Sequence, residues 1–187
     1  MTFKKAKEII DKLLNNEFSL INTETTFAII IEFIGGEPFI EIDLIDSICE
    51  YIIQQMIEKS HPWLQFLRFS ICSNGLLYNT PKVQEFFKKY NSWVSFGISI
   101  DGNKELHDQC RFDLSGNGTY DRAISSVLSH KQLYGNLPST KMTLSPDNIS
   151  YTYNALINLM ELGYTLVPFN CIFEEGWDYP HATILYN

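Results

Sequence analysis

Thr25-Thr-Phe-Ala-Ile-Ile-Ile-Glu-Phe33, followed by Ile34-Gly-Gly-Glu-Pro38, is the stretch that decides the fold. Its first part is rich in β-branched residues and almost continuously apolar, which is typical of a strand covered on both faces. The two glycines end the strand, and residues 43–59 return to helical spacing of apolar residues. A buried strand followed by an amphipathic helix predicts one βα unit of a parallel sheet.

The same alternation repeats on both sides of this stretch. The predicted helices cover residues 4–16 (with Thr2 as N-cap), 43–59, 81–90, 119–133 and 147–162, and the predicted strands cover 25–33, 66–72, 93–100, 140–144 and 165–172. Parallel strands joined in this way require right-handed crossovers through the helices. The order therefore predicts a single α/β domain over residues 1–187, with a parallel sheet and outer helices.

Composition narrows the class of protein. The 187 residues carry 14 basic and 22 acidic side chains, a net charge of −8, and 45% are hydrophobic. This supply of apolar side chains predicts a packed core, and the negative charge argues against binding to a phosphate backbone. No apolar run approaches the roughly 20 residues of a membrane span, and the first residues lack the apolar core of a signal peptide. We expect a cytoplasmic protein that contacts neither nucleic acid nor membrane.

Four predicted strands end in polar or turn-forming residues. The four strand ends are Gly35-Gly36-Glu37, Ser73-Asn74-Gly75, Ser99-Ile100-Asp101-Gly102 and Thr143-Leu144-Ser145. Ligands of parallel α/β folds bind at the carboxyl ends of the strands. Any one of these loops is explained by turn-forming residues alone, but the four together favour a ligand site.

The first of these loops suits a cationic group. Gly35 and Gly36 allow the backbone to approach a ligand closely or to adopt positive φ, and Glu37 places a carboxylate at the strand end. The alternative is an ordinary Gly-Gly turn with a solvated glutamate.

The third loop suits an anionic group. Ser99 and Asp101 are two residues apart and face the same side of a strand, and Arg111 offers a planar bidentate donor for a carboxylate. His107 and Asp108 resemble a base and its orienting carboxylate, but no nucleophile elbow accompanies them, so a hydrolase is disfavoured. The alternative is that His107, Asp108 and Arg111 hold a surface loop together.

Several motifs occur together in a family-like order. They are Phe33-Ile-Gly-Gly-Glu-Pro38, Ile71-Cys-Ser-Asn-Gly75, Ile98-Ser-Ile-Asp-Gly102, His107-Asp-Gln-Cys-Arg111, Gly116-Asn-Gly-Thr-Tyr-Asp121 and Lys141-Met-Thr-Leu-Ser145. In this order they resemble the core of radical S-adenosylmethionine (SAM) enzymes. The closer similarity is to the peptide-modifying branch, which includes anaerobic sulfatase-maturating enzymes and proteins with a C-terminal SPASM cluster domain. Within that branch, residues 37–46, 61–74 and 174–185 resemble the maturases of CXXX-repeat peptides.

The resemblance implies a partial (β/α)6 barrel that binds S-adenosylmethionine at the carboxyl ends of its strands. It also implies a peptide substrate and an electron donor such as a flavodoxin or a ferredoxin. Carried over by motif, the cofactor-binding residues are Gly35, Gly36 and Glu37 at the methionine amino group, Ser99 and Arg111 at its carboxylate, Asp101 shaping that strand end, and Asn74 and Thr143 lining the same cavity.

The cysteines depart from the family pattern. The family holds a [4Fe–4S] cluster with a CxxxCxxC loop after its first strand, and reductive cleavage of S-adenosylmethionine there yields a 5′-deoxyadenosyl radical that abstracts hydrogen from the substrate. Here the closest pair, Cys49 and Cys72, is 23 positions apart, whereas clusters and zinc sites draw two ligands from one short segment. We expect neither cluster nor other metal on this chain. Cys49, Cys72 and Cys171 are expected to be packed thiols, and Cys110 an exposed one.

The sequence therefore predicts an internal fragment of a radical SAM enzyme that modifies a ribosomally made peptide. The predicted fragment lacks the first strand of the barrel and the C-terminal cluster domain, is inactive alone, and is marginally stable and prone to associate through an open sheet edge. The alternative is a cluster-less module that binds a peptide or S-adenosylmethionine without catalysis. Iron content after anaerobic reconstitution separates the two hypotheses.

Overall fold

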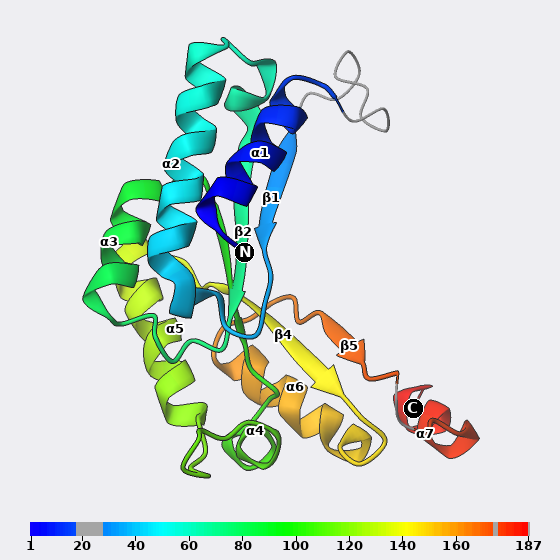
Figure 1. Cartoon of the computed structure of the whole chain (residues 1–187). Helices are drawn as coiled ribbons and strands as arrows, with labels where there is room; N and C mark the ends of the chain where they lie inside the picture. The colour runs from blue at the N-terminus through cyan, green and yellow to red at the C-terminus, as the bar shows by residue number, and fades with distance from the viewer. Residues whose placement is uncertain (18–27, 174–175, 187) are drawn as a thin grey trace. The chain divides into compact units, whose positions relative to one another are not determined.

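The computed structural model describes residues 1–17, 28–173 and 176–186 of the chain (Figure 1). The α-helices are α1 (Phe3–Leu14), α2 (Ile42–Glu58), α3 (Pro81–Tyr90), α4 (Lys104–Cys110), α5 (Tyr120–Tyr134), α6 (Thr152–Glu161) and α7 (Tyr179–Tyr186), and short 3-10 helices are η1 (Pro38–Glu41), η2 (Pro62–Phe66) and η3 (Ile149–Tyr151). The strands are β1 (Ile29–Phe33), β2 (Leu67–Ser73), β3 (Val94–Ser99), β4 (Ser139–Leu144) and β5 (Phe169–Cys171).

The strands lie in chain order, β1-β2-β3-β4-β5, and the pairs β1–β2, β3–β4 and β4–β5 are parallel. The predicted parallel α/β fold is therefore confirmed. The chain divides into two compact units. The first unit comprises Met1–Cys72 and Thr80–Phe96, and the second comprises Ser73–Asn79 and Gly97–Asn187. That the whole chain acts as one domain stays a prediction.

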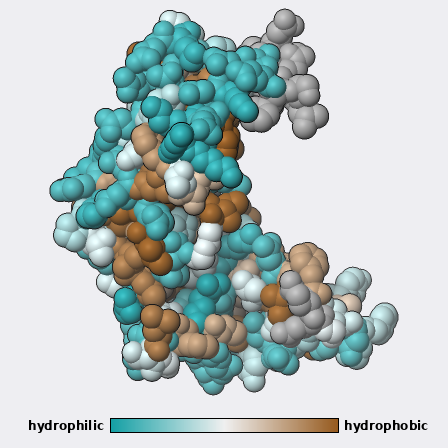
Figure 2. All heavy atoms as spheres, viewed as in Figure 1, coloured by the Kyte–Doolittle hydropathy of each residue, from teal (hydrophilic) through white to brown (hydrophobic). Residues whose placement is uncertain are grey.

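In the first unit, α1 begins at the predicted cap. Thr2 Oγ1 accepts the backbone N–H of Lys5 at 3.3 Å. Ala6, Ile10 and Leu14 recur at helical spacing and are buried, and α1 packs against α2 through this face. Figure 2 shows mostly hydrophilic residues on the outer surface around α1 and the end of α2. The amphipathic pattern thus fixes which side of α1 is covered.

Strands β1 and β2 of this unit pair in register from Ile29↔Leu67 to Phe33↔Ile71. Burial along β2 alternates, so that Leu67, Phe69 and Ile71 are buried, whereas Cys72 is exposed. The prediction that Cys72 is packed was therefore wrong. Its apolar surroundings in the sequence hid the two-residue period, which turns Cys72 to the same face as exposed Arg68.

An aromatic cluster fills the core of the first unit. Phe39 of η1 lies 6.0 Å from Phe87 of α3 and 5.6 Å from Phe96 at the start of β3, measured between ring centroids. Phe87 and Phe96 are 4.8 Å apart in an edge-on arrangement. Rings packed at these distances stabilise a core beyond the burial of their area alone. They hold the chain just after Glu37 against α3.

The second unit contains the last residues of β3, from Gly97 onward, together with β4 and β5. Strand β3 pairs with β4 in the register Gly97↔Ser139 to Ser99↔Lys141. Strand β4 pairs with β5 in a register that begins at Met142↔Phe169. Gly102, directly after β3, has φ of +100°, and a Cβ atom there would lie 2.2 Å from the Cβ of Ala155. Glycine is therefore required where the chain leaves β3 and passes close to α6.

The predicted elements differ from the observed ones mainly at their ends. Residues 25–27 of the first predicted strand lie outside the described residues. The last predicted strand, 165–172, shrinks to Phe169–Cys171 because Pro168 has no N–H to donate to a ladder. Helices α4 and α7 were not predicted, since seven and eight residues are too few for a clear period. In the described part of the chain, no helix has the length and apolarity that crossing a membrane requires.

Candidate functional site

The predicted site residues fall into two groups, one in each unit. Gly35, Gly36 and Glu37 lie in the first unit, after β1. The second unit holds the rest, which are Asn74, Ser99, Asp101, Arg111 and Thr143.

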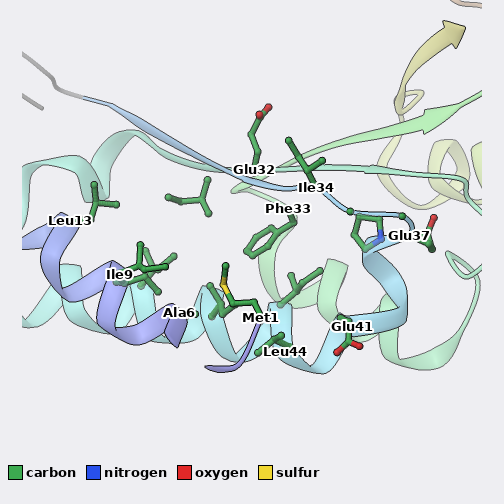
Figure 3. A pocket seen from close by; sticks show the side chains of 18 residues that line it. Met1, Ala6, Ile9, Leu13, Glu32, Phe33, Ile34, Glu37, Glu41 and Leu44 are labelled. Carbon is green, nitrogen blue, oxygen red and sulfur yellow. The ribbon is translucent and has the colours of Figure 1, made fainter. Parts of the chain in front are cut away.

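In the first unit, the glycine loop borders a pocket of about 430 Å³ between α1, β1 and α2 (Figure 3). Its walls are mostly apolar, and its ionisable side chains are the carboxylates of Glu32, Glu37 and Glu41. Figure 3 shows Phe33 directed between the helices, whereas Glu32 points to the other side of β1. Two of the three carboxylates, Glu37 and Glu41, thus stand at one end of an apolar cavity.

Glu37 caps the turn that follows the loop. Its Oε1 accepts the backbone N–H of Phe39 at 3.1 Å, at the start of η1. Neither Gly35 nor Gly36 has a left-handed backbone, and a Cβ atom at either position would meet nothing within 4 Å. The prediction that these glycines adopt positive φ is therefore wrong. The other predicted reason for them, room for a ligand to approach the backbone closely, agrees with the open space.

In the second unit, Asp101 is the centre of the polar cluster. Its side chain is 2% exposed, yet its carboxylate has three partners. Arg111 donates from Nε to Oδ2 at 2.5 Å and from Nη2 to Oδ1 at 3.2 Å, and the backbone N–H of Thr143 donates to Oδ1 at 2.8 Å. A buried carboxylate with a bidentate guanidinium and a backbone donor is fully compensated. Asp101 thereby joins the ends of β3 and β4 to the end of α4.

Arg111 keeps donors to spare after binding Asp101. A guanidinium has five N–H groups, of which Asp101 takes two. The Arg111 side chain is 27% exposed, so it is not closed off from solvent. The sequence placed Arg111 and Asp101 at the same strand end but did not predict that they pair. Their pairing leaves a rigidly held guanidinium edge that can accept an anion.

His107 is a buried linker. Its Nδ1 accepts the backbone N–H of Asp101 at 3.3 Å, and its Nε2 lies 3.1 Å from Thr119 Oγ1. Burial lowers the pKa of His107, and the nearby Arg111 guanidinium lowers it further. Both ring nitrogens are engaged and the residue is 1% exposed, so His107 has no nitrogen with which to serve as a hydrolytic base.

Asp108 has a capping role instead of orienting His107. Its Oδ1 accepts the backbone N–H of Tyr120 at 2.8 Å, at the start of α5, and its Oδ2 lies 3.4 Å from Lys104 Nζ. Although partial burial acts in the opposite direction, these two donors lower the pKa of Asp108. The sequence left open whether His107 and Asp108 act as a base and its orienting carboxylate or hold a loop together. The structure supports the second role for both residues.

The other predicted residues serve the loops themselves. Asn74 Oδ1 accepts the N–H of Leu76 at 2.9 Å, and Ser99 is half-buried at the end of β3. The carbonyl of Thr143 accepts Asn148 Nδ2 at 3.1 Å, while Asn148 Oδ1 accepts the N–H of Ser145 at 2.8 Å. Sequence reasoning missed Asn148 and Thr119, two buried polar residues whose only signal is that each directly precedes a helix.

The cysteines do not form a cluster site. Cys49 is buried in α2, Cys110 is exposed in α4, and Cys72 and Cys171 lie in β2 and β5. Over residues 1–17, 28–173 and 176–186, no three His, Cys, Asp or Glu side chains are grouped so as to hold a metal ion. The donor set of this chain therefore does not fit a [4Fe–4S] cluster, which needs three thiolates at one place.

Comparisons with known proteins identify relatives. No family model matches the sequence. Over 119 residues the chain is 30% identical to the cysteine-type anaerobic sulfatase-maturating enzyme of Clostridium novyi, which covers 64% of this chain and 29% of the relative. Over 172 residues it is 28% identical to the radical SAM cyclopropyl synthase TigE of Paramaledivibacter caminithermalis, covering 89% of this chain and 33% of the relative. The chain thus spans about a third of these curated relatives.

Solved structures share the fold. Native anSMEcpe with bound AdoMet and Kp18Cys peptide matches with a TM-score of 0.72 and 17% identity, over 97% of this chain and 47% of that one. Native anSMEcpe with bound AdoMet matches with the same TM-score and 18% identity, over 97% and 46%. The match confirms the expected partial barrel. The finer similarity to CXXX-repeat maturases stays a prediction.

Proposed function

Because the chain is related in sequence and fold to radical SAM enzymes that modify peptides, we propose that it binds S-adenosylmethionine at the carboxyl end of β3 as part of such an enzyme. The observation that carries this proposal is the Asp101–Arg111 pair, in which a buried carboxylate holds the guanidinium of a partly exposed arginine side chain. The guanidinium binds the carboxylate of the methionine moiety, and the hydroxyl of Ser99 adds a second donor. Asp101 keeps Arg111 from turning away when no ligand is bound.

Within the first unit, the family resemblance assigns Glu37 to the ammonium group of the amino acid, independently of the residues of the second unit. Glu37 binds the methionine ammonium, and the open space over Gly35 and Gly36 admits it. This role rests on the family resemblance and on the opposite charges of the two groups. Asn74 and Thr143 complete the set as lining residues of the same cofactor.

After one-electron reduction by a cluster that this chain's thiols do not hold, bound S-adenosylmethionine would yield methionine and a 5′-deoxyadenosyl radical, which would take hydrogen from a peptide substrate. This chain contributes the binding and orientation of the cofactor, and its thiols provide no cluster to reduce it. A ribosomally made peptide as substrate, a flavodoxin or ferredoxin as electron donor, and a cytoplasmic location belong to the same proposal. Two solved structures related in fold contain bound peptides, which supports the first of these.

Calorimetric titration of the 187-residue chain tests the binding role. S-Adenosylmethionine and S-adenosylhomocysteine carry the amino-acid end, whereas methylthioadenosine lacks it. Arg111→Ala should weaken the first two by about tenfold or more and leave the third unchanged, because a charged hydrogen-bonded pair contributes about 1.5–3 kcal/mol. Glu37→Gln should show the same selectivity. Equal effects on all three ligands, or none, would contradict the assignment.

The second candidate function is a module that binds peptide or S-adenosylmethionine without catalysis. The separation of the four cysteines on four elements favours it for the chain alone. Anaerobic reconstitution with iron and sulfide, followed by reduction in the presence of S-adenosylmethionine, distinguishes the two. A bound cluster together with release of 5′-deoxyadenosine would establish catalysis by this chain. Binding of S-adenosylmethionine with neither a cluster nor 5′-deoxyadenosine would establish the binding module.

A further inference from the structure

Four residues of the second unit form a closed hydrogen-bonded ring. The backbone N–H of Asp101 donates to His107 Nδ1 at 3.3 Å, and His107 Nε2 lies 3.1 Å from Thr119 Oγ1. Thr119 Oγ1 in turn donates to the carbonyl of Arg111 at 3.2 Å. The side chains of Arg111 and Asp101 close the ring through their bidentate pair. The ring thus connects both the backbones and the side chains of the pair.

The direction of every bond in the ring is determined. A backbone N–H can only donate, so Nδ1 of His107 must accept and the ring proton must lie on Nε2. Nε2 then donates to Thr119 Oγ1, and the hydroxyl proton of Thr119 is left to donate to the carbonyl of Arg111. One tautomer and one hydroxyl orientation satisfy all the partners at once.

Thr119 can take part in the ring because Asp108, and not Thr119, caps the start of α5. Thr119 is the N-cap residue of α5, where threonine normally accepts a backbone N–H of the first turn, but its side chain makes no such bond. Asp108 accepts the N–H of Tyr120 instead. Gly118 leaves room for that carboxylate, since a Cβ atom there would lie 2.1 Å from Asp108 Cγ. Thr119 and His107 are 5% and 1% exposed, so water does not compete for the ring.

We propose that Thr119 and His107 are positioning residues for Arg111, holding its backbone so that its guanidinium stays on Asp101 with its remaining donors presented to an anionic ligand. The proposal deepens the proposed function and, for the ligand, rests on it. Arg111 follows the last residue of the short helix α4, where a side chain with four rotatable bonds would otherwise sample many orientations. The ring removes that freedom before any ligand arrives.

The matched variants are Thr119→Val and Thr119→Ser. Valine keeps the shape of threonine and loses the hydroxyl, whereas serine keeps the hydroxyl and loses a methyl group. Thr140→Val controls for the general effect of losing a buried hydroxyl, because Thr140 is 3% exposed and donates to the carbonyl of Ile98 at 3.0 Å in the same unit. A common loss of thermal stability in the two valine variants is thereby separated from any effect on Arg111.

The direct readout is the Nε–H resonance of Arg111, identified by its absence in Arg111→Lys. In the unliganded wild type, in Thr119→Ser and in Thr140→Val, we expect slow exchange of this proton with solvent and a high order parameter. In Thr119→Val both should be lost, while the Nε2–H signal of His107 shifts. A wild-type Arg111 signal in Thr119→Val would overturn the proposal, whatever the ligand measurements give.

The second readout is affinity for S-adenosylmethionine. Thr119→Val should weaken binding by about tenfold and Thr119→Ser by less than about twofold, with no change in methylthioadenosine binding. If Arg111→Ala binds like wild type, the proposed function fails, and the resonance of Arg111 still decides the positioning role. If Arg111→Ala weakens binding and Thr119→Val does not, the proposed function stands and the positioning role in binding is refuted.

Discussion

Gly102 and Ala155 approach so closely that no side chain fits between them. A Cβ atom on Gly102 would lie 2.2 Å from Ala155 Cβ and 2.7 Å from its Cα, and the φ of Gly102 is +100°. Contact with a backbone atom leaves little room to relax, because α6 would have to move as a whole.

Gly102→Ala should therefore lower the free energy of unfolding by about 3 kcal/mol, from the combined cost of the left-handed backbone and the overlap. Gly135→Ala is the control, since Gly135 also has positive φ but a Cβ atom there would meet nothing within 4 Å. It should cost about 1 kcal/mol. Urea unfolding measures both, and equal losses would show that the overlap with α6 does not matter.

The cap of α5 by Asp108 gives a second prediction. Gly118→Ala should displace the Asp108 carboxylate, and Asp108→Ala should remove it, so each should cost about 1 kcal/mol or more for the lost cap. Because both changes remove the same interaction, the double variant should cost little more than either alone. Asp108→Asn keeps an acceptor oxygen and should stay close to wild type. Additive losses in the thermodynamic cycle would refute the shared cause.

Stability should decline on mild acidification. Burial lowers the pKa of His61, His107 and His130 below the unfolded value of about 6.5. Between the folded and unfolded pKa values the unfolded chain binds more protons, so the free energy of unfolding falls as the pH drops below about 6.5. Asp108 and Asp113 have lowered pKa values, so their contribution to the free energy of unfolding is lost only at a more acid pH, where carboxylates are protonated.

Urea unfolding at pH values of about 7.5 and 5.5 measures this decline. The variant His130→Gln should make the free energy of unfolding less dependent on pH, because it removes one of the three groups. Equal stability of the wild type at the two pH values would contradict the effect of burial on these histidines.

The chain should associate through β1, an edge strand with exposed apolar side chains. Ile30 is 63% exposed and Ile34, just beyond the strand, is 85% exposed, and among the described residues β1 has a strand neighbour on one edge only. Replacing both with lysine should shift sedimentation toward the monomer, because charges on an edge strand oppose pairing. Ile57→Lys, on a residue that is 58% exposed in α2, is the control and should change nothing. A monomeric wild type would refute the prediction of an associating edge.

The sequence predicted the succession of helices and strands because the apolar periods of the longer elements are strong. It also predicted that Asp101 and Arg111 serve the same strand end. It did not predict that they pair, because the returning helix α4 has only seven residues, and no period indicated that Arg111 turns back toward Asp101.

Thr119 could not be found from the sequence because its role depends on contacts between residues far apart. Threonine before a helix predicts an N-cap, and only the structure shows that Asp108 has taken this task. Cys72 was misjudged for a related reason, since the burial of one face of β2 depends on the element that covers it.

The segment Ser73–Asn79 leaves the first unit and belongs to the second. Ser126 of α5 holds it by donating to the carbonyl of Gly75 at 2.7 Å, and the fully buried Tyr78 places its hydroxyl 2.9 Å from His130 Nδ1. Neither unit is therefore one continuous piece of chain. A recombinant piece cut at Gly97 would carry α5 without the tyrosine that fills its inner side, so dissection by truncation or limited proteolysis would damage both halves.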